Sequence, residues 1–165
     1  MRILTFRGYV LLIALGLMIA VALAAGTARA QETHMHHANG TFTVTMTPAD
    51  PEVVEAGLGL SRYTLAKTFE GGLTGTGTGQ MLAGGVSAGT QTYIALERVV
   101  GTLDGREGAF LLAHRGDMSP DGFSLSIMVV PNSGTGALEG LTGDFALTIT
   151  GGVHHYDLAY SLPGS

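Results

Sequence analysis

Hydrophobic and polar residues alternate with a period of two over most of the chain after residue 40. The clearest stretch is 41–46, in which Phe42, Val44 and Met46 share one face and three threonines share the other. Such alternation is typical of a β-strand with one buried face. Seven further stretches of this kind follow, at residues 60–70, 73–82, 91–103, 108–115, 122–130, 144–150 and 155–162. The pattern predicts eight strands and almost no helix.

The segments between these stretches are short and rich in turn residues, such as Asp104-Gly105 and Gly151-Gly152. The stretch from Pro48 to Gly59 is longer than these turns, and its two prolines interrupt a strand, so we expect a loop or a single helical turn there. Eight sequential strands favour an antiparallel barrel or a sandwich. We prefer an all-β, eight-stranded antiparallel closed barrel, because closure removes the exposed strand edges.

The first thirty residues have the order of a secretory signal. Arg2 and Arg7 precede an apolar run from Tyr9 to Ala25, and small residues at Ala28 and Ala30 suit a signal peptidase. The alternative is an uncleaved anchor, but the run is shorter than the roughly 20 residues that span a membrane as a helix. We expect a signal helix over residues 1–30, one mature domain over residues 31–165, a periplasmic or secreted location, and no membrane contact after cleavage.

The composition excludes several classes of function. The chain carries a net charge of −5, and removing the three arginines of the signal leaves 5 basic against 13 acidic residues, or −8. So acidic a domain is a poor binder of nucleic acid. The absence of cysteine excludes thiol catalysis, disulfides and cysteine-ligated metals. We expect no cofactor.

Glycines alternate with threonines over residues 75–79, which places three glycines on one face of a strand. No Lys-Ser/Thr pair follows them, so they do not form a phosphate-binding loop. We expect this face to lie very close to another part of the barrel, either a corner or another backbone.

Three charged or titratable residues lie on apolar strand faces. Lys67 shares its face with Tyr63, Leu65 and Phe69, Glu97 follows Tyr93 and Ala95, and His114 follows Phe110 and Leu112. Such groups pair, shift their pKa or line a wet pocket when they are buried. Lys67, Glu97 and His114 are therefore the candidate catalytic residues. The alternative is an exposed cross-strand Lys–Glu pair and a histidine bonded to backbone.

Four aromatic residues on apolar strand faces are candidates for the lining of a ligand cavity: Tyr63, Tyr93, Phe110 and Tyr156. The opposite face of the strand 91–103 is also apolar, with Ile94, Leu96 and Val100. Another subunit is the simplest cover for such a face, so we expect a homo-oligomer.

Five of the six histidines cluster near the two ends of the mature chain, and imidazole is a good zinc or copper ligand. They are His34, His36, His37, His154 and His155. Because adjacent residues of a strand point to opposite faces, we treat them only as weak metal candidates and favour a flexible polar segment and a turn. No Gly-x-Ser-x-Gly elbow and no inward pair of carboxylates is present, so serine hydrolase and glycosidase chemistry are disfavoured.

From His37 to Tyr160 the chain resembles a small bacterial family, a domain of unknown function with the eight-stranded barrel also found in plant allene oxide cyclases and dirigent proteins. The resemblance rests on residues 37–42, 68–71, 96–99, 101–108, 114–116, 130–136 and 138–143 together with Phe110, Tyr156, Leu158 and Tyr160. It implies the barrel more firmly than any activity. Relatives with this barrel isomerise or cyclise small molecules, or steer radical coupling, within a hydrophobic cavity. Many members of this family begin directly at the segment that corresponds to His37, whereas this chain has an export signal before it.

Three functions remain open at this point. The first is a binding protein that holds a small apolar or amphipathic molecule inside the barrel. The second is an isomerase or cyclase with Glu97 and His114 as acid and base and Lys67 as electrostatic support. The third is a structural oligomer with a solid interior.

Overall fold

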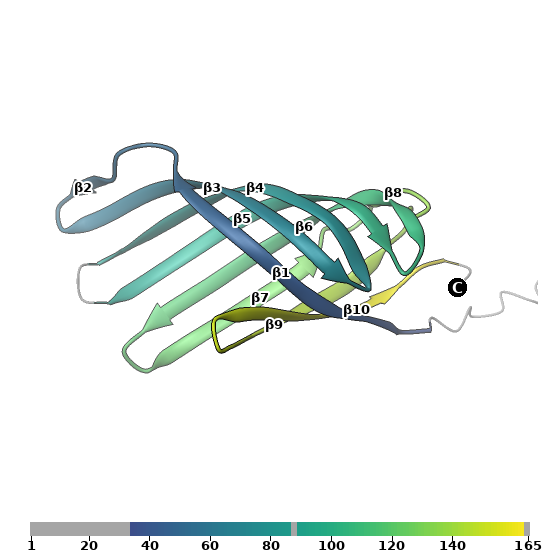
Figure 1. Ribbon diagram of the computed structural model, residues 1–165. Coiled ribbons are helices and arrows are strands. Elements are labelled where there is room, and N and C mark those ends of the chain that lie inside the picture. Colours follow the sequence, from purple (N-terminus) through teal and green to yellow (C-terminus); the bar gives the residue numbers. More distant parts are fainter. Residues whose placement is uncertain (1–33, 87–88, 164–165) are drawn as a thin grey trace, which may run out of the picture. The chain divides into compact units, whose positions relative to one another are not determined.

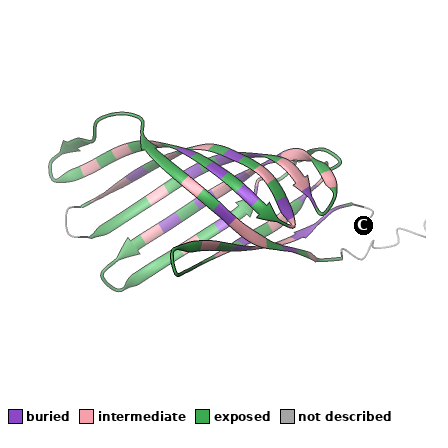
Figure 2. Ribbon diagram, viewed as in Figure 1, coloured by how far each residue is buried: buried purple, intermediate pink, exposed green. Residues whose placement is uncertain are grey.

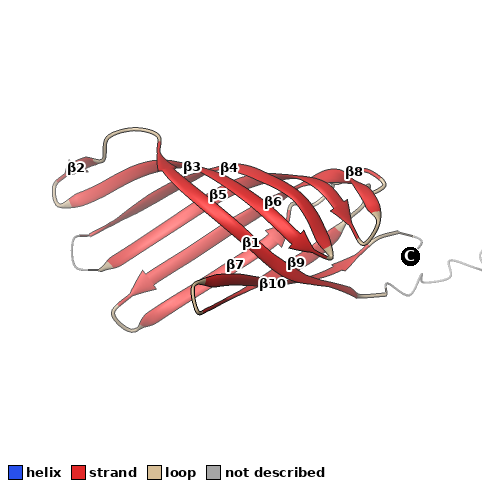
Figure 3. Ribbon diagram, viewed as in Figure 1, coloured by secondary structure: helices blue, strands red, loops and turns tan. Residues whose placement is uncertain are grey.

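The computed structural model describes residues 34–86 and 89–163. The expected signal helix and the cleavage site after Ala30 lie outside these residues. Every regular element of the described part is a β-strand (Figure 3). The ten strands are β1 (His36–Pro48), β2 (Val53–Glu55), β3 (Leu58–Gly71), β4 (Leu73–Val86), β5 (Thr90–Leu103), β6 (Arg106–Ser119), β7 (Gly122–Val129), β8 (Thr135–Gly136), β9 (Thr142–Thr150) and β10 (Val153–Ser161).

Eight of these strands form a closed antiparallel barrel, which confirms the predicted fold class (Figure 1). The order is β1-β10-β9-β7-β6-β5-β4-β3, and β1 pairs with β3 to close the circle. At the closure Phe42 lies opposite Phe69 on β3 and opposite His154 on β10. Because strands that follow one another in sequence are also neighbours in space, short hairpin turns suffice for most of the connections. Within the described residues no helix is long and apolar enough to cross a membrane.

The eight predicted strands are all present, and most are longer than the sequence pattern indicated. Two of the predicted turns, at Asp104-Gly105 and Gly151-Gly152, have positive φ at both residues, as tight hairpins with the twist of their strands require. His36 and His37, which we assigned to a flexible polar segment, belong to β1.

The stretch between Pro48 and Gly59 contains no helical turn, and part of it forms the short strand β2. Ala56 and Gly57 have φ values of 52° and 78°, so they form another tight hairpin that folds β2 back onto β3. The sequence pattern does not indicate this strand, because alanine is an unusual residue at positive φ.

The two ends of the barrel differ in packing. We call the end that carries β8 and the Asp104–Gly105 turn the closed end, and the end that carries β2 and the β6–β7 turn the open end. At the closed end the connection between β7 and β9 folds over the barrel, and its Leu138 and Leu141 are completely buried. Figure 2 shows buried residues concentrated toward this end and exposed residues prevailing at the other. A solid core therefore fills one end and leaves room for a site at the other.

Candidate functional site

The three charged residues predicted on apolar faces all point into the barrel. Lys67 comes from β3, Glu97 from β5 and His114 from β6. Each of them alternates with buried residues of its own strand, so the period of two turns all three side chains inward. Lys67 is 8% exposed, Glu97 0% and His114 7%.

Glu97 connects the other two residues. Its Oε2 accepts a hydrogen bond from Lys67 Nζ at 2.7 Å, and His114 Nε2 lies 3.1 Å from the same oxygen. The Lys67 ammonium also lies 4.6 Å from the centre of the Phe42 ring, within the range of a cation–π contact. We call Lys67, Glu97 and His114 the buried triad.

Two atoms of the buried triad remain without a hydrogen-bond partner within the described part of the chain, Glu97 Oε1 and His114 Nε2. The short distance from His114 Nε2 to Glu97 is therefore a close polar contact without the alignment of a hydrogen bond. Buried polar atoms are nearly always bonded in native proteins, so these two atoms are exceptions within a tightly packed part of the barrel.

The glycines of β4 make room for the Glu97 carboxylate. A methyl group at Gly77 would overlap Glu97 Oε1, and one at Gly79 would lie 2.5 Å from the Leu96 carbonyl oxygen and 3.0 Å from the Glu97 Cα. The alternation of glycine over residues 75–79 had predicted a close approach to this face. Its neighbours are the backbone of β5 and the Glu97 side chain.

The neighbours of Glu97 also govern its ionisation. Burial by itself would raise the pKa of the carboxyl group, but the contact with His114 and the charge and hydrogen bond of Lys67 outweigh burial and hold that pKa below its ordinary value. Glu97 is therefore an anion at neutral pH, paired with the Lys67 ammonium.

An apolar cavity of about 310 Å³ lies above the buried triad in the open half of the barrel. Its walls include Phe42, Val44, Leu65, Met81, Ile127 and Leu147, and its polar lining residues are Lys67, Gln91, Tyr93, His114 and His154. Met46 and Phe123 line it at the rim and are 57% and 59% exposed. The cavity thus reaches solvent at the open end, while Glu97 lies behind Lys67 and His114 and is fully buried.

The structure distributes the four predicted lining residues over the whole barrel. Tyr93 lines the cavity, and Tyr63 lies on the inner face opposite Met81 in the strand register. Phe110 and Tyr156 instead pack in the core, at 1% and 3% exposure. The Tyr156 hydroxyl accepts a hydrogen bond from the Leu73 backbone N–H at 2.8 Å and bonds to two carbonyl oxygens of the β3–β4 turn, so this tyrosine joins strands.

The five clustered histidines have separate surroundings. His36 stacks on Tyr160, and His154 makes a tilted ring contact with Phe42, with ring centres 5.3 and 5.0 Å apart. His37 Nδ1 lies 2.9 Å from a carboxylate oxygen of Asp157 on the outer face. His34 and His155 are exposed. Among residues 34–86 and 89–163, no three His, Asp or Glu side chains lie close enough to hold a metal ion.

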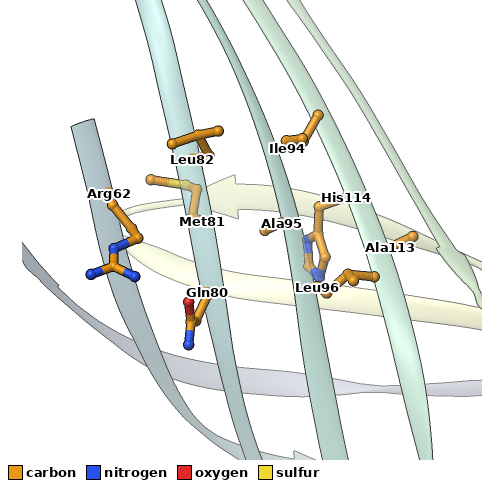
Figure 4. A pocket seen from close by; sticks show the side chains of 9 residues that line it. All are labelled: Arg62, Gln80, Met81, Leu82, Ile94, Ala95, Leu96, Ala113 and His114. Atoms are coloured by element: carbon orange, nitrogen blue, oxygen red, sulfur yellow. The ribbon is translucent and has the colours of Figure 1, made fainter. Parts of the chain in front are cut away.

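A second pocket of about 500 Å³ lies along the outer face of β3 to β6 (Figure 4). Leu82, Ile94 and Leu96 form much of it and are 41%, 56% and 59% exposed, with Arg62 at its edge. Although it is larger than the inner cavity, it is an open apolar surface, and its charged member is an arginine already bonded to Asp50. The inner cavity is therefore the better candidate for a small-molecule site.

Several lining residues were not predicted from the sequence, among them Met81, Phe123 and His154. His154 had been considered only as a metal ligand, although its alternation with Tyr156 and Leu158 placed it on the inner face of β10. Met81 continues the inward row of the β4 glycines, so the same alternation contained the signal. The alternation does not show how far along the barrel axis each inward residue lies.

Comparisons with known proteins agree with the fold and add no activity. No curated protein matches the chain. Among solved structures, the chain is similar to a protein of unknown function from the DUF3224 family of Shewanella oneidensis MR-1, with 39% identity and a TM-score of 0.72 over 77% of this chain and 97% of that one. The family described as "Protein of unknown function (DUF3224)" matches residues 38–160, which include the whole buried triad. The chain belongs to this family.

Proposed function

We propose that the protein binds a small amphipathic molecule in the open half of its barrel. The observation that carries this proposal is the cavity of about 310 Å³, with apolar walls and with Lys67 and His114 at its base. Ligand sites are typically concave and mostly apolar, with a few polar groups that orient the ligand. The volume lies at the lower end of the usual range of about 300–1,000 Å³, which suits a small organic molecule.

The rim of the cavity supports the same function. Met46, Met118 and Phe123 line the cavity from the inner faces of their strands, yet all three are at least 40% exposed. Inner-face side chains with this exposure offer an apolar path from solvent to the cavity, and the flexibility of methionine suits entry and exit.

A cavity-filling substitution tests this function. We expect Ala95→Leu, on the inner face of β5, to reduce the cavity and to abolish binding of a retained or added ligand. Ala66→Leu is the matched control, because Ala66 is exposed on the outer face of β3. Native mass spectrometry of the two variants and the parent protein reports any retained organic mass. Equal retention by both variants would contradict binding in the cavity.

A second candidate function is that of an isomerase or cyclase for a small hydrophobic substrate, and the buried triad is the observation that favours it. His114 would move a proton between two positions of the substrate, and the Lys67 ammonium would stabilise an oxyanion. Glu97 lies behind both residues, so in this role it is a positioning residue. The predicted resemblance to allene oxide cyclases and dirigent proteins supports this second candidate function.

The two candidates differ in the effect of one substitution. In an enzyme, His114→Gln removes turnover of the substrate and leaves its binding within a few fold. In a binding protein no turnover exists to be lost, and NMR spectra of the bound ligand remain those of the added molecule. Conversion of the ligand by the parent protein alone would favour the enzyme.

We further propose that the protein is exported and forms a homo-oligomer. The order of residues 1–30 supports export, and N-terminal sequencing of the mature protein tests it, since cleavage after Ala30 leaves Gln31 as the first residue. The exposed apolar side chains on the outer face of β4 and β5 support assembly. A structural oligomer without ligand remains the alternative if the isolated protein retains and binds nothing.

A further inference from the structure

We propose that the ligand of the barrel carries a carboxylate, that this group binds between Lys67 and His114, and that binding is accompanied by uptake of one proton at His114. This inference rests on the proposed function and adds the chemical class of the ligand. It follows from the polar groups that face the cavity, from their unused hydrogen-bonding capacity and from the balance of buried charge.

The polar groups facing the cavity are donors or neutral groups. Lys67, His114 and His154 are basic, and Gln91 and Tyr93 are uncharged. The Glu97 carboxylate contacts two of the lining residues, Lys67 and His114, but is itself fully buried behind them. An incoming anion therefore meets no acidic side chain at the cavity surface, whereas an incoming cation meets the Lys67 ammonium.

Lys67 and His114 have capacity left for a further acceptor. The Lys67 ammonium has three N–H groups, and Glu97 Oε2 accepts one of them. His114 Nε2 is buried and has no hydrogen-bond partner within the described residues. Both nitrogens contact the same oxygen of Glu97, at 2.7 and 3.1 Å, so they lie close together. His114 lines the cavity, and a turn of its ring from Glu97 toward the cavity would let one carboxylate bond to both side chains.

The balance of charge then requires a proton. Lys67 and Glu97 neutralise each other, so a buried carboxylate added beside them would leave one uncompensated negative charge, which is costly in an apolar cavity. The titratable groups around His114 are Glu97, Lys67, Tyr93 and His154. Among these, imidazole is the group that readily gains a proton near neutral pH, and the His114 imidazole is in direct contact with the Glu97 carboxylate.

The side chains of the cavity walls determine the chemistry of the rest of the ligand. Phe42, Leu65, Met81, Ile127 and Leu147 surround the space above Lys67 and His114, and the rim is apolar as well. A molecule with several charges or many hydroxyl groups would lose its hydration there without replacement. The ligand class is therefore a monocarboxylate with one apolar tail.

Three probes with the same ten-carbon chain test the head group: decanoate, decanol and decylammonium. We expect isothermal titration calorimetry at pH 7 to show decanoate binding at least about tenfold tighter than decanol, because a hydrogen bond to a charged group adds more than a neutral one. Decylammonium should bind weakest. The enthalpy for decanoate should differ between phosphate and Tris buffers by an amount that corresponds to one proton taken up.

Two variants test which side chains cause the preference for decanoate and the proton uptake. Lys67→Met together with Glu97→Gln removes both charges without leaving one of them unpaired, and it should reduce the preference for decanoate over decanol about tenfold with decanol binding retained. His114→Gln should remove the buffer dependence of the enthalpy. Ala66→Leu, on the outer face, is the control and should behave as the parent protein.

Each outcome decides one of the two proposals. Equal binding of decanoate and decanol would overturn the carboxylate inference and leave cavity binding intact. A preference for decylammonium would overturn it as well, and decanoate binding without proton uptake would overturn the role of His114. Failure of all three probes to bind would count against the proposed function itself.

Discussion

Removal of the Lys67 ammonium is expected to destabilise the fold strongly. The substitution Lys67→Met keeps an unbranched apolar stem but deletes the donor that lies 2.7 Å from Glu97 Oε2. Glu97 is 0% exposed, so no water replaces the lost partner. Breaking a buried pair in this way costs about 3–5 kcal/mol, a large share of the roughly 5–15 kcal/mol that stabilises an ordinary domain.

The double variant Lys67→Met/Glu97→Gln should recover this loss. It removes both charges together, and replacement of a whole buried pair by uncharged residues of similar volume is often neutral or stabilising by about 1–4 kcal/mol. We expect the double variant to lie within about 1 kcal/mol of the parent protein or above it. The pair would then be retained for binding, because stability alone does not require it.

The assay is urea unfolding at pH 7 of the parent, both single variants and the double variant. The chain has no tryptophan and five tyrosines, so tyrosine fluorescence and far-ultraviolet circular dichroism report the transition. If the losses of the single variants simply add in the double variant, the two residues are not coupled and the reasoning is refuted. Unchanged m-values would show that the compared transitions are the same.

Acid unfolding gives an independent check on Glu97. Its pKa in the folded protein lies below the ordinary value, so the folded state binds this proton more weakly than the unfolded chain does. The stability that Glu97 contributes is therefore present above the unfolded pKa of about 4.3 and is lost as the pH falls through the lowered folded value. Glu97→Gln should flatten the loss of stability in this acid range. An unchanged acid profile would show that other carboxyl groups dominate it.

Three further substitutions test other parts of the structure. Gly77→Ala places a methyl group on Glu97 Oε1 and should cost about 1–3 kcal/mol in urea unfolding, and a loss below about 0.5 kcal/mol would contradict the close packing. Burial and a carboxylate partner raise the pKa of Tyr160 to about 12, so stability should fall between about pH 10, where the unfolded tyrosine ionises, and pH 12. Tyr160→Phe should remove that dependence, and an identical alkaline transition would argue against it. Ile94→Glu on the outer apolar face should convert an oligomer to monomers in light scattering, whereas Thr76→Glu, six residues further along the outer face of the paired strand β4, should not. Equal masses for both variants would place the subunit contact elsewhere.

Much of the fold follows from local patterns. Alternation at Phe42, Val44 and Met46 predicted β1, and the turn chemistry of Asp104-Gly105 predicted the β5–β6 hairpin. Local patterns misrepresented the start of β1, where His36 and His37 were assigned to a flexible segment, and the segment 48–59, where Ala56 adopts positive φ. Residue propensities do not predict positive φ at an alanine, because this conformation is costly for a residue with a Cβ atom.

The sequence by itself determined which face each side chain takes. Successive residues of a strand point to opposite sides, so Lys67, Glu97 and His114 were assigned to apolar faces from their neighbours alone. Only the tertiary structure decided that they meet, since alternation contains no information about the register between strands. Register is set by pairing around the whole closed barrel, and it places Lys67 Nζ 2.7 Å from a carboxylate 30 residues away.

The cavity depended on the tertiary structure even more. Phe110 and Tyr156 share the inward orientation of Tyr93, but they lie in the packed half of the barrel and Tyr93 in the open half. The difference arises because Leu138 and Leu141, from a connection between two strands, fill one end only. Side chains from several strands together decide whether a part of the interior is filled or empty. The pattern of one strand therefore cannot predict the cavity, which forms only when the barrel closes.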